Sequence, residues 1–568
     1  MKRNNPFVWA LLLLASGCME EGPEMENDAR ATVSMADHTE VPMRDDARSA
    51  VVASDAELWQ RIEEAGRTAT VGLKAPGARR GVWRGSKLIP PEEARQARQA
   101  VLAQPGVTLL SEDELLPRIE VKLEDRGVME RLRRLPFVDY LEPARFQIVT
   151  FDFGCGNNAS GGTPYPGPFA YDPQTSDVVP WNYDRIEISR AWGRGAAGQG
   201  VTVGIVDTGL FAEQGQLWPP GFTARDPLRS HVYFANYPSD YYDTCNHGTR
   251  MAGVIAAPRD GINITGVAFR SNVRVSRAIA DVYTGGGAPT SPIINGIRSV
   301  VLNGARIVTM AWGQEFSSEA IADEIRWHYF NQDVLFIGAA GTTLCPPFGI
   351  FPAKMDEVVS VTGLKDDDTV HPDACGYETV DIGAVIGAAP STGRNPWDIV
   401  SFGGSSNATA LVAGTAALVW SKNPHFNRNQ VRERLYQSTG RLYRNNQGTG
   451  WGRVNAYRAV GGFHALSIST SNSLPYVGQT VTFTALPKGD GPFAYSWSTN
   501  STSPQTSLKC TSGGTVLNVS VVVRDLTDGT VKTSSTRVSC QSGEPDPCEL
   551  RPWLCFDLCD AKPWLCDE

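Results

Sequence analysis

The 568-residue sequence has little net charge and lacks any apolar run long enough to cross a membrane. Its 52 basic and 61 acidic residues leave a formal charge of −9, which argues against a nucleic-acid-binding protein. A spanning helix needs roughly 20 apolar residues, and no uninterrupted stretch reaches that length. The composition that remains, 41% apolar and 20% charged, is typical of a soluble globular protein. The length suggests three to five domains, at about 100–200 residues each.

The first eighteen residues have the pattern of an export signal. Lys2 and Arg3 form a basic start, and an apolar run of nine residues follows at 7–15, which suits a signal peptide at 1–17. The run leads into Ala-Ser-Gly-Cys, which resembles a bacterial lipobox and predicts a lipid on Cys18. The alternative is an ordinary signal peptide that leaves Cys18 unmodified. Both alternatives export the chain, so disulfides are expected.

Composition divides the rest of the chain into segments. Residues 18–50 read as a solvated tether, because 19–48 holds nine acidic and three basic residues and no aromatic ones. The boundaries that we predict after the tether are a small α+β unit at 51–147, a linker at 148–178, an α/β unit at 179–460, a β-rich unit at 464–541 and a cysteine-rich tail at 542–568.

The α/β unit alternates short β-branched runs with Ala-rich helical stretches. The expected strands are 201–206, 273–278, 307–310, 334–339 and 358–362, and the expected helices are 247–257, 292–303, 319–331, 407–421 and 428–437. Such alternation predicts a mainly parallel sheet with helices on both faces. In open sheets of this kind, sites lie beyond the carboxyl ends of the strands.

The flanking units have different patterns. The unit at 51–147 reads as helix, strand, helix, strand, at 92–103, 118–123, 125–135 and 138–141. The unit at 464–541 has four strand-like runs rich in Thr, Ser and Val and no helical pattern, which predicts an all-β sandwich.

Three residues in the α/β unit stand in motifs that carry chemistry. Asp207 ends an apolar strand before Thr-Gly, a position from which a carboxylate can orient an imidazole. His247 opens a helix of small residues. Ser406 follows Phe-Gly-Gly-Ser and begins another helix, whose first N–H groups can stabilise an oxyanion. Taken singly, each has a plain structural explanation, such as a helix cap for the serine.

The combination is far more specific than its parts. Asp, His and Ser follow one another at separations of 40 and 159 residues, and this order is that of subtilisin. Thr-Gly-Val-Ala after the histidine helix and Phe-Pro-Ala at 351–353 also match the family. The region 179–460 therefore resembles a subtilisin-like serine peptidase of the subtilase family. The resemblance implies acyl transfer with Ser406 as nucleophile, His247 as general base and Asp207 as its orienting partner.

The sequence departs from the family pattern near the predicted site. Thr342 stands where the family has an asparagine that donates to the oxyanion, and its hydroxyl is shorter than an amide. Loss of that donor in subtilisin costs about 10²–10³ in turnover, so Thr342 either substitutes in part or leaves a slow enzyme. Ala311, Trp312 and Gly313 resemble the strand that pairs with the substrate, although Trp312 is bulkier than the usual leucine.

The resemblance extends to the neighbouring units. Residues 51–147 resemble a pro-domain that inhibits its own peptidase, with cleavage expected within 144–175. The alternative is a permanent accessory domain. The unit at 464–541 resembles Ig-like or PKD-like accessory domains. No cofactor is required, and calcium is expected only from the family likeness.

The leading hypothesis is an exported serine endopeptidase made as an inhibited precursor. Its expected partners are protein or peptide substrates and its own pro-domain, with no nucleic acid and with membrane contact only through a lipid anchor. It would reside in the cell envelope as a lipoprotein or be secreted after processing. The alternative is a weak or inactive pseudo-peptidase that acts as a surface peptide-binding module.

The eleven cysteines fit this division into units. If Cys18 carries lipid, ten remain, and each unit holds an even number, which favours local disulfides. The pairs that we predict are Cys155 with Cys245, Cys345 with Cys375, and Cys510 with Cys540. The four cysteines of the tail lack paired Cys-x-x-Cys spacing, so two disulfides are favoured there over zinc.

Overall fold

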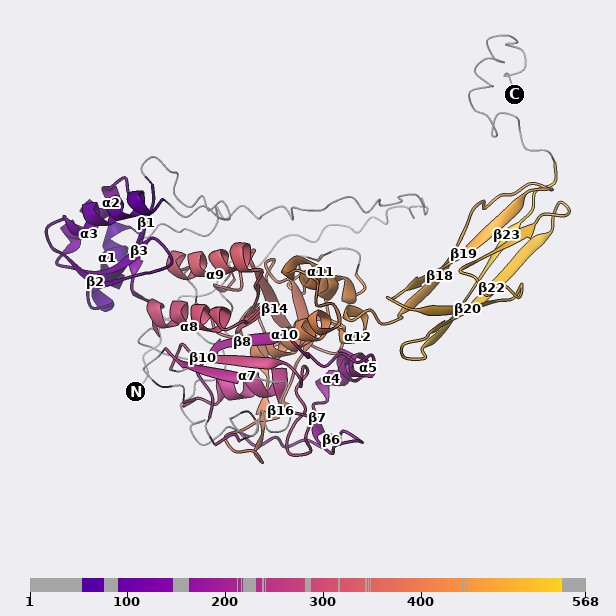
Figure 1. Cartoon of the computed structure of the whole chain (residues 1–568), viewed down its shortest axis with the longest axis horizontal. Helices are drawn as coiled ribbons and strands as arrows, with labels where there is room; N and C mark the ends of the chain where they lie inside the picture. Colours follow the sequence, from indigo (N-terminus) through magenta and orange to yellow (C-terminus); the bar gives the residue numbers. More distant parts are fainter. Residues whose placement is uncertain are drawn as a thin grey trace, which may run out of the picture. The chain divides into compact units, whose positions relative to one another are not determined.

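The computed structural model describes residues 54–75, 90–146 and 163–543, except for 212, 216, 218–230, 237–239, 241, 281–287, 315–316, 343–344, 346, 348, 442–443 and 446 (Figure 1). The predicted signal peptide, tether and lipid site at Cys18 lie outside these residues, as do Cys155 and the four cysteines of the tail.

The N-terminal unit is richer in elements than the sequence predicted. In order, it contains α1 (Asp55–Glu64), β1 (Thr68–Leu73), α2 (Pro91–Leu102), β2 (Val107–Glu112), β3 (Arg118–Leu123), α3 (Arg126–Arg134) and β4 (Val138–Pro143). The strands form an antiparallel sheet in the order β2-β3-β1-β4. The predicted helix-strand-helix-strand order missed α1, β1 and β2. β1 is buried along almost its whole length and so lacks alternation, whereas β2 is an edge strand that exposes Leu109 and Leu110.

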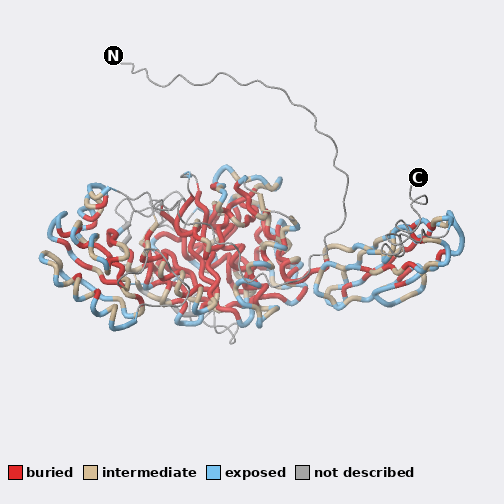
Figure 2. The backbone as a smooth tube through the Cα atoms, turned by 90° about the horizontal axis from the view of Figure 1, so that it is seen from above, coloured by how far each residue is buried: buried red, intermediate tan, exposed pale blue. Residues whose placement is uncertain are grey.

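The central unit contains the predicted parallel sheet, which has seven strands, the five that were expected and also β9 and β15. Its order is β15 (Ile382–Val385), β14 (Val358–Leu364), β13 (Leu335–Ala339), β12 (Ile307–Met310), β8 (Thr202–Asp207), β10 (Asn272–Arg277) and β9 (His231–Ala235). Every neighbouring pair in this sheet is parallel. The buried part of the backbone is concentrated in this unit (Figure 2).

Helices cover both faces of this sheet. The elements around it are α4 (Asn182–Arg185), α5 (Ile188–Gly193), α7 (His247–Ala256), α8 (Thr290–Leu302), α9 (Glu319–Gln332), α10 (Gly404–Lys422), α11 (Arg428–Ser438) and α12 (Ala456–Ala459). Strand β8 shows the division, because Val203 and Ile205 join one core with α7 and α10, whereas Val206 joins a second core with α8 and α9. A strand buried on both faces in this way reads as a continuous apolar run.

Three small ribbons accompany the main sheet. They are β5 (Arg145–Phe146) with β11 (Ala288–Pro289), β6 (Ala170–Tyr171) with β7 (Val178–Val179), and β16 (Ala389–Thr392) with β17 (Ile399–Phe402), all antiparallel. The last of these leads into α10 and so carries the chain to Ser406.

The C-terminal unit consists of two three-stranded antiparallel sheets. One is β18 (Ala465–Thr470), β19 (Thr480–Lys488) and β21 (Gln505–Lys509), and the other is β20 (Phe493–Trp497), β22 (Val516–Asp525) and β23 (Val531–Ser539). Side chains of both sheets share one hydrophobic core. The sequence predicted four of the six strands and missed β18 and β21. The likeness to Ig-like or PKD-like domains stays a prediction.

Two of the three predicted disulfides are confirmed. Cys345 pairs with Cys375 and Cys510 pairs with Cys540. The third prediction involves Cys155, outside the described residues. Across the ranges given above, none of the helices combines the length and the apolar character that crossing a membrane would require.

Candidate active site

Asp207 and His247 form a buried, hydrogen-bonded pair. His247 Nδ1 lies 2.8 Å from Asp207 Oδ1, and the two side chains are 0% and 1% exposed. An ionised carboxylate can only accept, so Nδ1 carries the proton in this pair, which leaves Nε2 as the basic nitrogen of the ring. The sequence prediction had placed these two residues at one site, and the structure brings them together.

Local backbone geometry explains how the two residues meet. Asp207 is the last residue of β8, at the carboxyl edge of the sheet, and His247 is the first residue of α7. A β-carbon on Gly248 would lie 2.2 Å from the carbonyl oxygen of Gly209, so only glycine permits this approach of helix to strand end. Gly209 itself has a φ of +106°, a conformation that other residues rarely adopt.

Asp243 stabilises the turn before α7, a role that the sequence did not predict. Its Oδ1 accepts from the backbone N–H groups of Cys245 and Asn246 and from the hydroxyl of Thr208. Its Oδ2 accepts from both the N–H and the hydroxyl of Thr249. An aspartate shortly before a helix is a known start signal, and that pattern was present in the sequence.

Ser406 is the third residue of α10 and is 6% exposed. Asn407 donates its backbone N–H to the carbonyl of Gly403 and so makes the first bond of the helix. The N–H of Ser406 therefore precedes that bond and belongs to the first turn, where the helix dipole favours negative charge. The ring of Phe402, at the end of β17, meets the His247 ring edge-on at 5.6 Å, which places His247 beside the strand that leads to Ser406.

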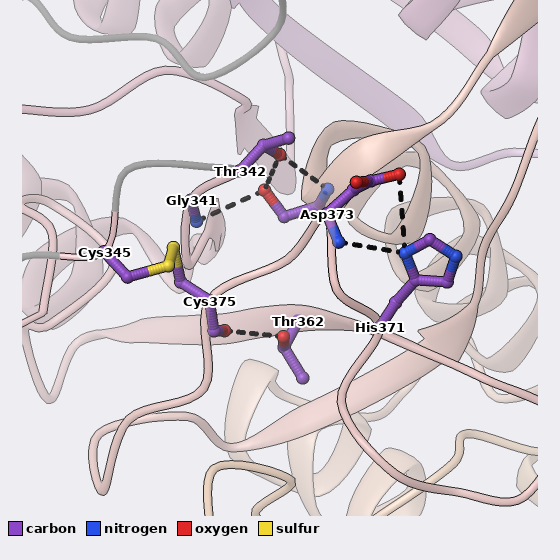
Figure 3. The surroundings of a disulfide bond; sticks show 8 residues. Gly341, Thr342, Cys345, Thr362, His371, Asp373 and Cys375 are labelled. Carbon is purple, nitrogen blue, oxygen red and sulfur yellow. Dashed lines mark hydrogen bonds and ion pairs between the residues drawn. A yellow bond between two sulfur atoms is a disulfide. The ribbon is translucent and has the colours of Figure 1, made fainter.

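Thr342 lies three residues beyond the end of β13 and contacts Ser405. Its Oγ1 accepts from the backbone N–H of Ser405 and is also 3.0 Å from Ser405 Oγ. Figure 3 shows Gly341 and Thr342 with their hydrogen bonds beside the Cys345–Cys375 disulfide. The sequence predicted no role for Ser405.

Trp312 is part of the core. It is 2% exposed, and its indole N–H donates to the carbonyl of Val206 at 2.9 Å. The side chain that is bulkier than the family's leucine therefore packs between the central sheet and its helices. A β-carbon on Gly313 would collide with Ile350, and Gln314 exchanges two backbone hydrogen bonds with Phe351. The segment of Ala311, Trp312 and Gly313 is thus held from one side by residues 350–351.

Asn407, the residue after Ser406, makes a defined buried contact. It is 1% exposed, and its side-chain oxygen accepts from the amide of Asn182 at 2.9 Å. The same amide nitrogen of Asn182 donates to the carbonyl of Val385. The residue after Ser406 is therefore tied to the start of the central unit and to strand β15.

Among the side chains of residues that the structure describes, no three His, Cys, Asp or Glu gather as a metal site would require. The family-level expectation of calcium stays an expectation.

Comparisons with known proteins agree with the geometry. A model described as the subtilase family matches residues 198–453. The chain is 30% identical over 265 residues to a thermostable alkaline protease of Halalkalibacterium halodurans, covering 46% of this chain and 68% of that protein. It is 29% identical over 289 residues to alkaline elastase YaB of a Bacillus species, covering 50% of this chain and 71% of that protein.

A solved structure shares the fold. It is that of fervidolysin from Fervidobacterium pennivorans, described as a keratinolytic enzyme related to subtilisin. The likeness covers 84% of this chain and 77% of that one, with a TM-score of 0.52 and 14% identity. The predicted subtilisin-like arrangement of sheet and helices is therefore confirmed.

Proposed function

The chain belongs to the subtilase family of serine endopeptidases, and from this premise we propose that Asp207, His247 and Ser406 form its catalytic triad. The observation that carries the proposal is the buried hydrogen bond between Asp207 Oδ1 and His247 Nδ1 at 2.8 Å. A histidine held in this tautomer presents its basic Nε2 to a nucleophile.

The chemistry follows from these positions. Ser406 Oγ attacks the carbonyl carbon of the scissile peptide bond, and its proton passes to His247 Nε2. The carbon–nitrogen bond then breaks, and the same proton goes to the leaving amine. Water attacks the acyl-enzyme by the reverse sequence and frees Ser406. Throughout, Asp207 keeps the ring oriented and stabilises the imidazolium that forms twice in each cycle.

A serine-directed fluorophosphonate tests the triad. We expect it to label Ser406 of the processed protein and to fail on Ser406→Ala, with His247→Ala reducing labelling strongly. A folded, processed chain that does not react would instead support the peptide-binding module. His425, whose ring packs on Phe426 away from this site, offers a control: His425→Ala should label like the parent protein.

Residues 51–147 act in this proposal as an inhibitory pro-domain of the precursor. Three sets of contacts to the central unit support this part. Arg118 of β3 is 5% exposed and donates to the carbonyl of Ala320 and to the carboxylate of Glu324 on α9. Asp113 accepts from Arg298 on α8. Glu142 of β4 accepts from the Ser318 hydroxyl and from the N–H groups of Glu319 and Ala320, where α9 begins.

Two carboxylates in these contacts respond to pH in opposite directions. Burial raises the pKa of Glu142 from 4.5 to about 8, although its three donors oppose the rise. The folded chain therefore holds the proton of Glu142 more tightly than the unfolded chain does. The stability of the folded state that this group contributes is fully present below about pH 4.5 and is lost as the pH rises toward 8. Burial also acts to raise the pKa of Glu324, but the His328 hydrogen bond and the charges of Arg118 and Arg298 outweigh it and hold that pKa well below its usual range. Its contribution is lost as the pH falls below 4.5.

The processing proposal has a direct test. N-terminal sequencing of the purified, active protein should show a start that corresponds to cleavage within 144–175, and a start before residue 100 would contradict it. In the uncut Ser406→Ala chain, Arg118→Ala should weaken the packing of the N-terminal unit on α9 by about 3–5 kcal/mol. The substitution leaves Glu324 buried with fewer partners. Arg126→Ala is the matched control, since Arg126 pairs only at the surface with Glu130 of its own helix.

Export, and lipid on Cys18, complete the proposal and rest on the leader sequence. Metabolic labelling with a radioactive fatty acid should mark the precursor and not its Cys18→Ser variant. An unlabelled but exported precursor would favour the ordinary signal peptide.

A further inference from the structure

The two hydroxyl groups of Thr342 and Ser405 form a closed hydrogen-bonded pair directly before the nucleophile. Thr342 Oγ1 accepts from the Ser405 backbone N–H at 3.0 Å, and the two hydroxyl oxygens are also 3.0 Å apart. Ser405 Oγ in turn accepts from the N–H of Gly341 at 3.2 Å. Figure 3 shows the hydrogen bonds of Gly341 and Thr342 at this point.

Among the residues that the structure describes, the hydrogen bonds of this pair leave one hydroxyl proton over. A hydroxyl carries one proton and two lone pairs. Each oxygen of the pair already accepts one backbone N–H, and one hydroxyl proton lies between the two oxygens. If Ser405 donates that proton, both lone pairs of Thr342 are filled and the proton of Thr342 points away from the pair. If Thr342 donates instead, the proton of Ser405 is the one left over.

Burial decides between these arrangements. Ser405 is 1% exposed and Thr342 is 6% exposed. A buried O–H without an acceptor is costly, so we assign the leftover proton to the less buried of the two residues, which is Thr342. Ser405 therefore donates to Thr342, and Thr342 keeps a proton to offer.

We infer that Ser405 is a positioning residue that turns the Thr342 hydroxyl into an oxyanion donor. It fills the second lone pair of Thr342 Oγ1 and so directs the remaining proton out of the pair. The oxyanion would then be held by the Thr342 O–H and by the N–H of Ser406 in the first turn of α10. A short hydroxyl can thus take the place of the longer amide, because its rotation is restricted in advance. This inference rests on the proposed triad.

The backbone on either side of Thr342 and Ser405 also favours the contact between their hydroxyl groups. Gly404 has a φ of +67°, and a β-carbon there would lie 2.7 Å from Thr342 Oγ1. Any side chain at 404 would therefore push Thr342 away from Ser405. On the other side, the carbonyl of Gly341 accepts from the N–H of Cys375 at 2.9 Å, which holds the residue before Thr342.

Four variants of the full-length protein, assayed after processing, test the inference by steady-state kinetics on a peptide substrate. Thr342→Val removes the hydroxyl and should lower kcat about 10²-fold with little change in KM. Ser405→Ala should lower kcat about 10-fold, again with KM nearly constant. Ser405→Thr keeps a hydroxyl and should restore most of the rate. The double variant Thr342→Val/Ser405→Ala should be no slower than Thr342→Val alone, because Ser405 acts only through Thr342.

A peptide aldehyde separates positioning from a general structural effect. Its carbonyl carbon bonds to Ser406 Oγ and its oxygen enters the oxyanion position, so Ser405→Ala should weaken its inhibition by the same factor as kcat/KM. Binding of the corresponding product peptide should not change. Thr415→Val is the matched control: it removes another buried hydroxyl of α10, which donates to Leu411, and should leave kcat unchanged.

The results that would overturn the inference are distinct from a failure of the proposed function. If the parent protein neither hydrolyses peptides nor reacts with a fluorophosphonate, the triad proposal fails. If the parent is active but Ser405→Ala is equally fast, or if Ser405→Ala slows Thr342→Val further by its full factor, Ser405 does not act through Thr342 and the inference is wrong.

Discussion

The two disulfides of the described chain close segments of equal length in very different surroundings. Cys345–Cys375 and Cys510–Cys540 both span 30 residues, so chain entropy predicts the same stabilisation for each, about 3–4 kcal/mol. Cys510 and Cys540 follow β21 and β23 and join the two C-terminal sheets within their shared core. In the central unit Cys345 is exposed and Cys375 is buried.

The two disulfides differ in the residues to which their backbones are hydrogen-bonded. The N–H of Cys375 donates to Gly341, whose own N–H donates to Ser405, the residue before the proposed nucleophile. Cys510 and Cys540 instead donate their backbone N–H groups to the carbonyls of Gln479 and Thr515, which belong to their own unit. Two disulfides of equal span can therefore have different roles. The C-terminal one stabilises its own unit, and the central one also holds the backbone beside the proposed site.

The largest effect should come from removing the central bond. Cys345→Ser/Cys375→Ser should lower kcat about 10- to 100-fold, because small displacements near the reacting atoms are costly. It should also lower the free energy of unfolding by about 3–4 kcal/mol. Peptide kinetics and thermal unfolding measure the two losses. Unchanged kcat in a destabilised variant would show that the Gly341 segment holds itself in place.

Mild reduction should reach the same bond first. Cys345 is exposed, whereas Cys510 and Cys540 are 0% and 3% exposed, and a thiolate must reach a sulfur to attack it. With increasing reductant, alkylation and mass spectrometry should find Cys345 and Cys375 modified while Cys510 and Cys540 stay paired. Activity should fall in step with that first modification. Simultaneous modification of all four would remove this distinction.

Removing the C-terminal bond should affect stability only. Cys510→Ser/Cys540→Ser should lower the stability of the C-terminal sheets by about 3–4 kcal/mol and leave kcat within about twofold of the parent. Calorimetry and the same peptide assay provide the readouts. A loss of kcat comparable to that of the central variant would break the comparison between the two bonds.

The smallest effect is expected at a single hydrogen bond beside the central disulfide. Thr362 of β14 donates its hydroxyl to the carbonyl of Cys375 at 2.6 Å (Figure 3). Thr362→Val keeps the shape and should cost about 1–2 kcal/mol, with kcat changed less than about twofold. Urea unfolding resolves such a change. A change in kcat of more than about twofold would mean that the carbonyl of Cys375 also helps to position Gly341.

Strong periodic segments were predictable from the sequence, and weakly patterned ones were not. The expected strands at 118–123 and 307–310 match β3 and β12 at both ends. β21 was not predicted because its polar run Gln505–Lys509 buries only Thr506, so nothing in its composition indicates a strand. α10 begins at Gly404 and not at 407, since two glycines conceal the start of a helix.

The site shows the same division between motif and context. The Asp, His and Ser motifs predicted the carboxylate–imidazole pair because their residues are fixed by chemistry. Asp243 and Ser405 could not be assigned in the same way, because their roles depend on partners 6 and 63 residues away, Thr249 and Thr342. A serine or aspartate shows its role only when the fold brings such partners into contact.

The attachment of the N-terminal unit to α8 and α9 has a consequence for the order of folding. The central strand β8 pairs with β12 across about 100 residues of sequence, as in the pair Val203 and Ile307, and such long-range parallel pairing is slow. Asp113 and Arg118 bind Arg298 of α8 and Glu324 of α9 together, and these helices flank β12 in the sequence. A chain that makes this contact early fixes α8 and α9 on either side of β12, which lowers the entropy cost that remains when β8 and β12 meet. The same ion pairs would then act twice, first while the sheet is built and again when they hold the N-terminal unit on the folded precursor.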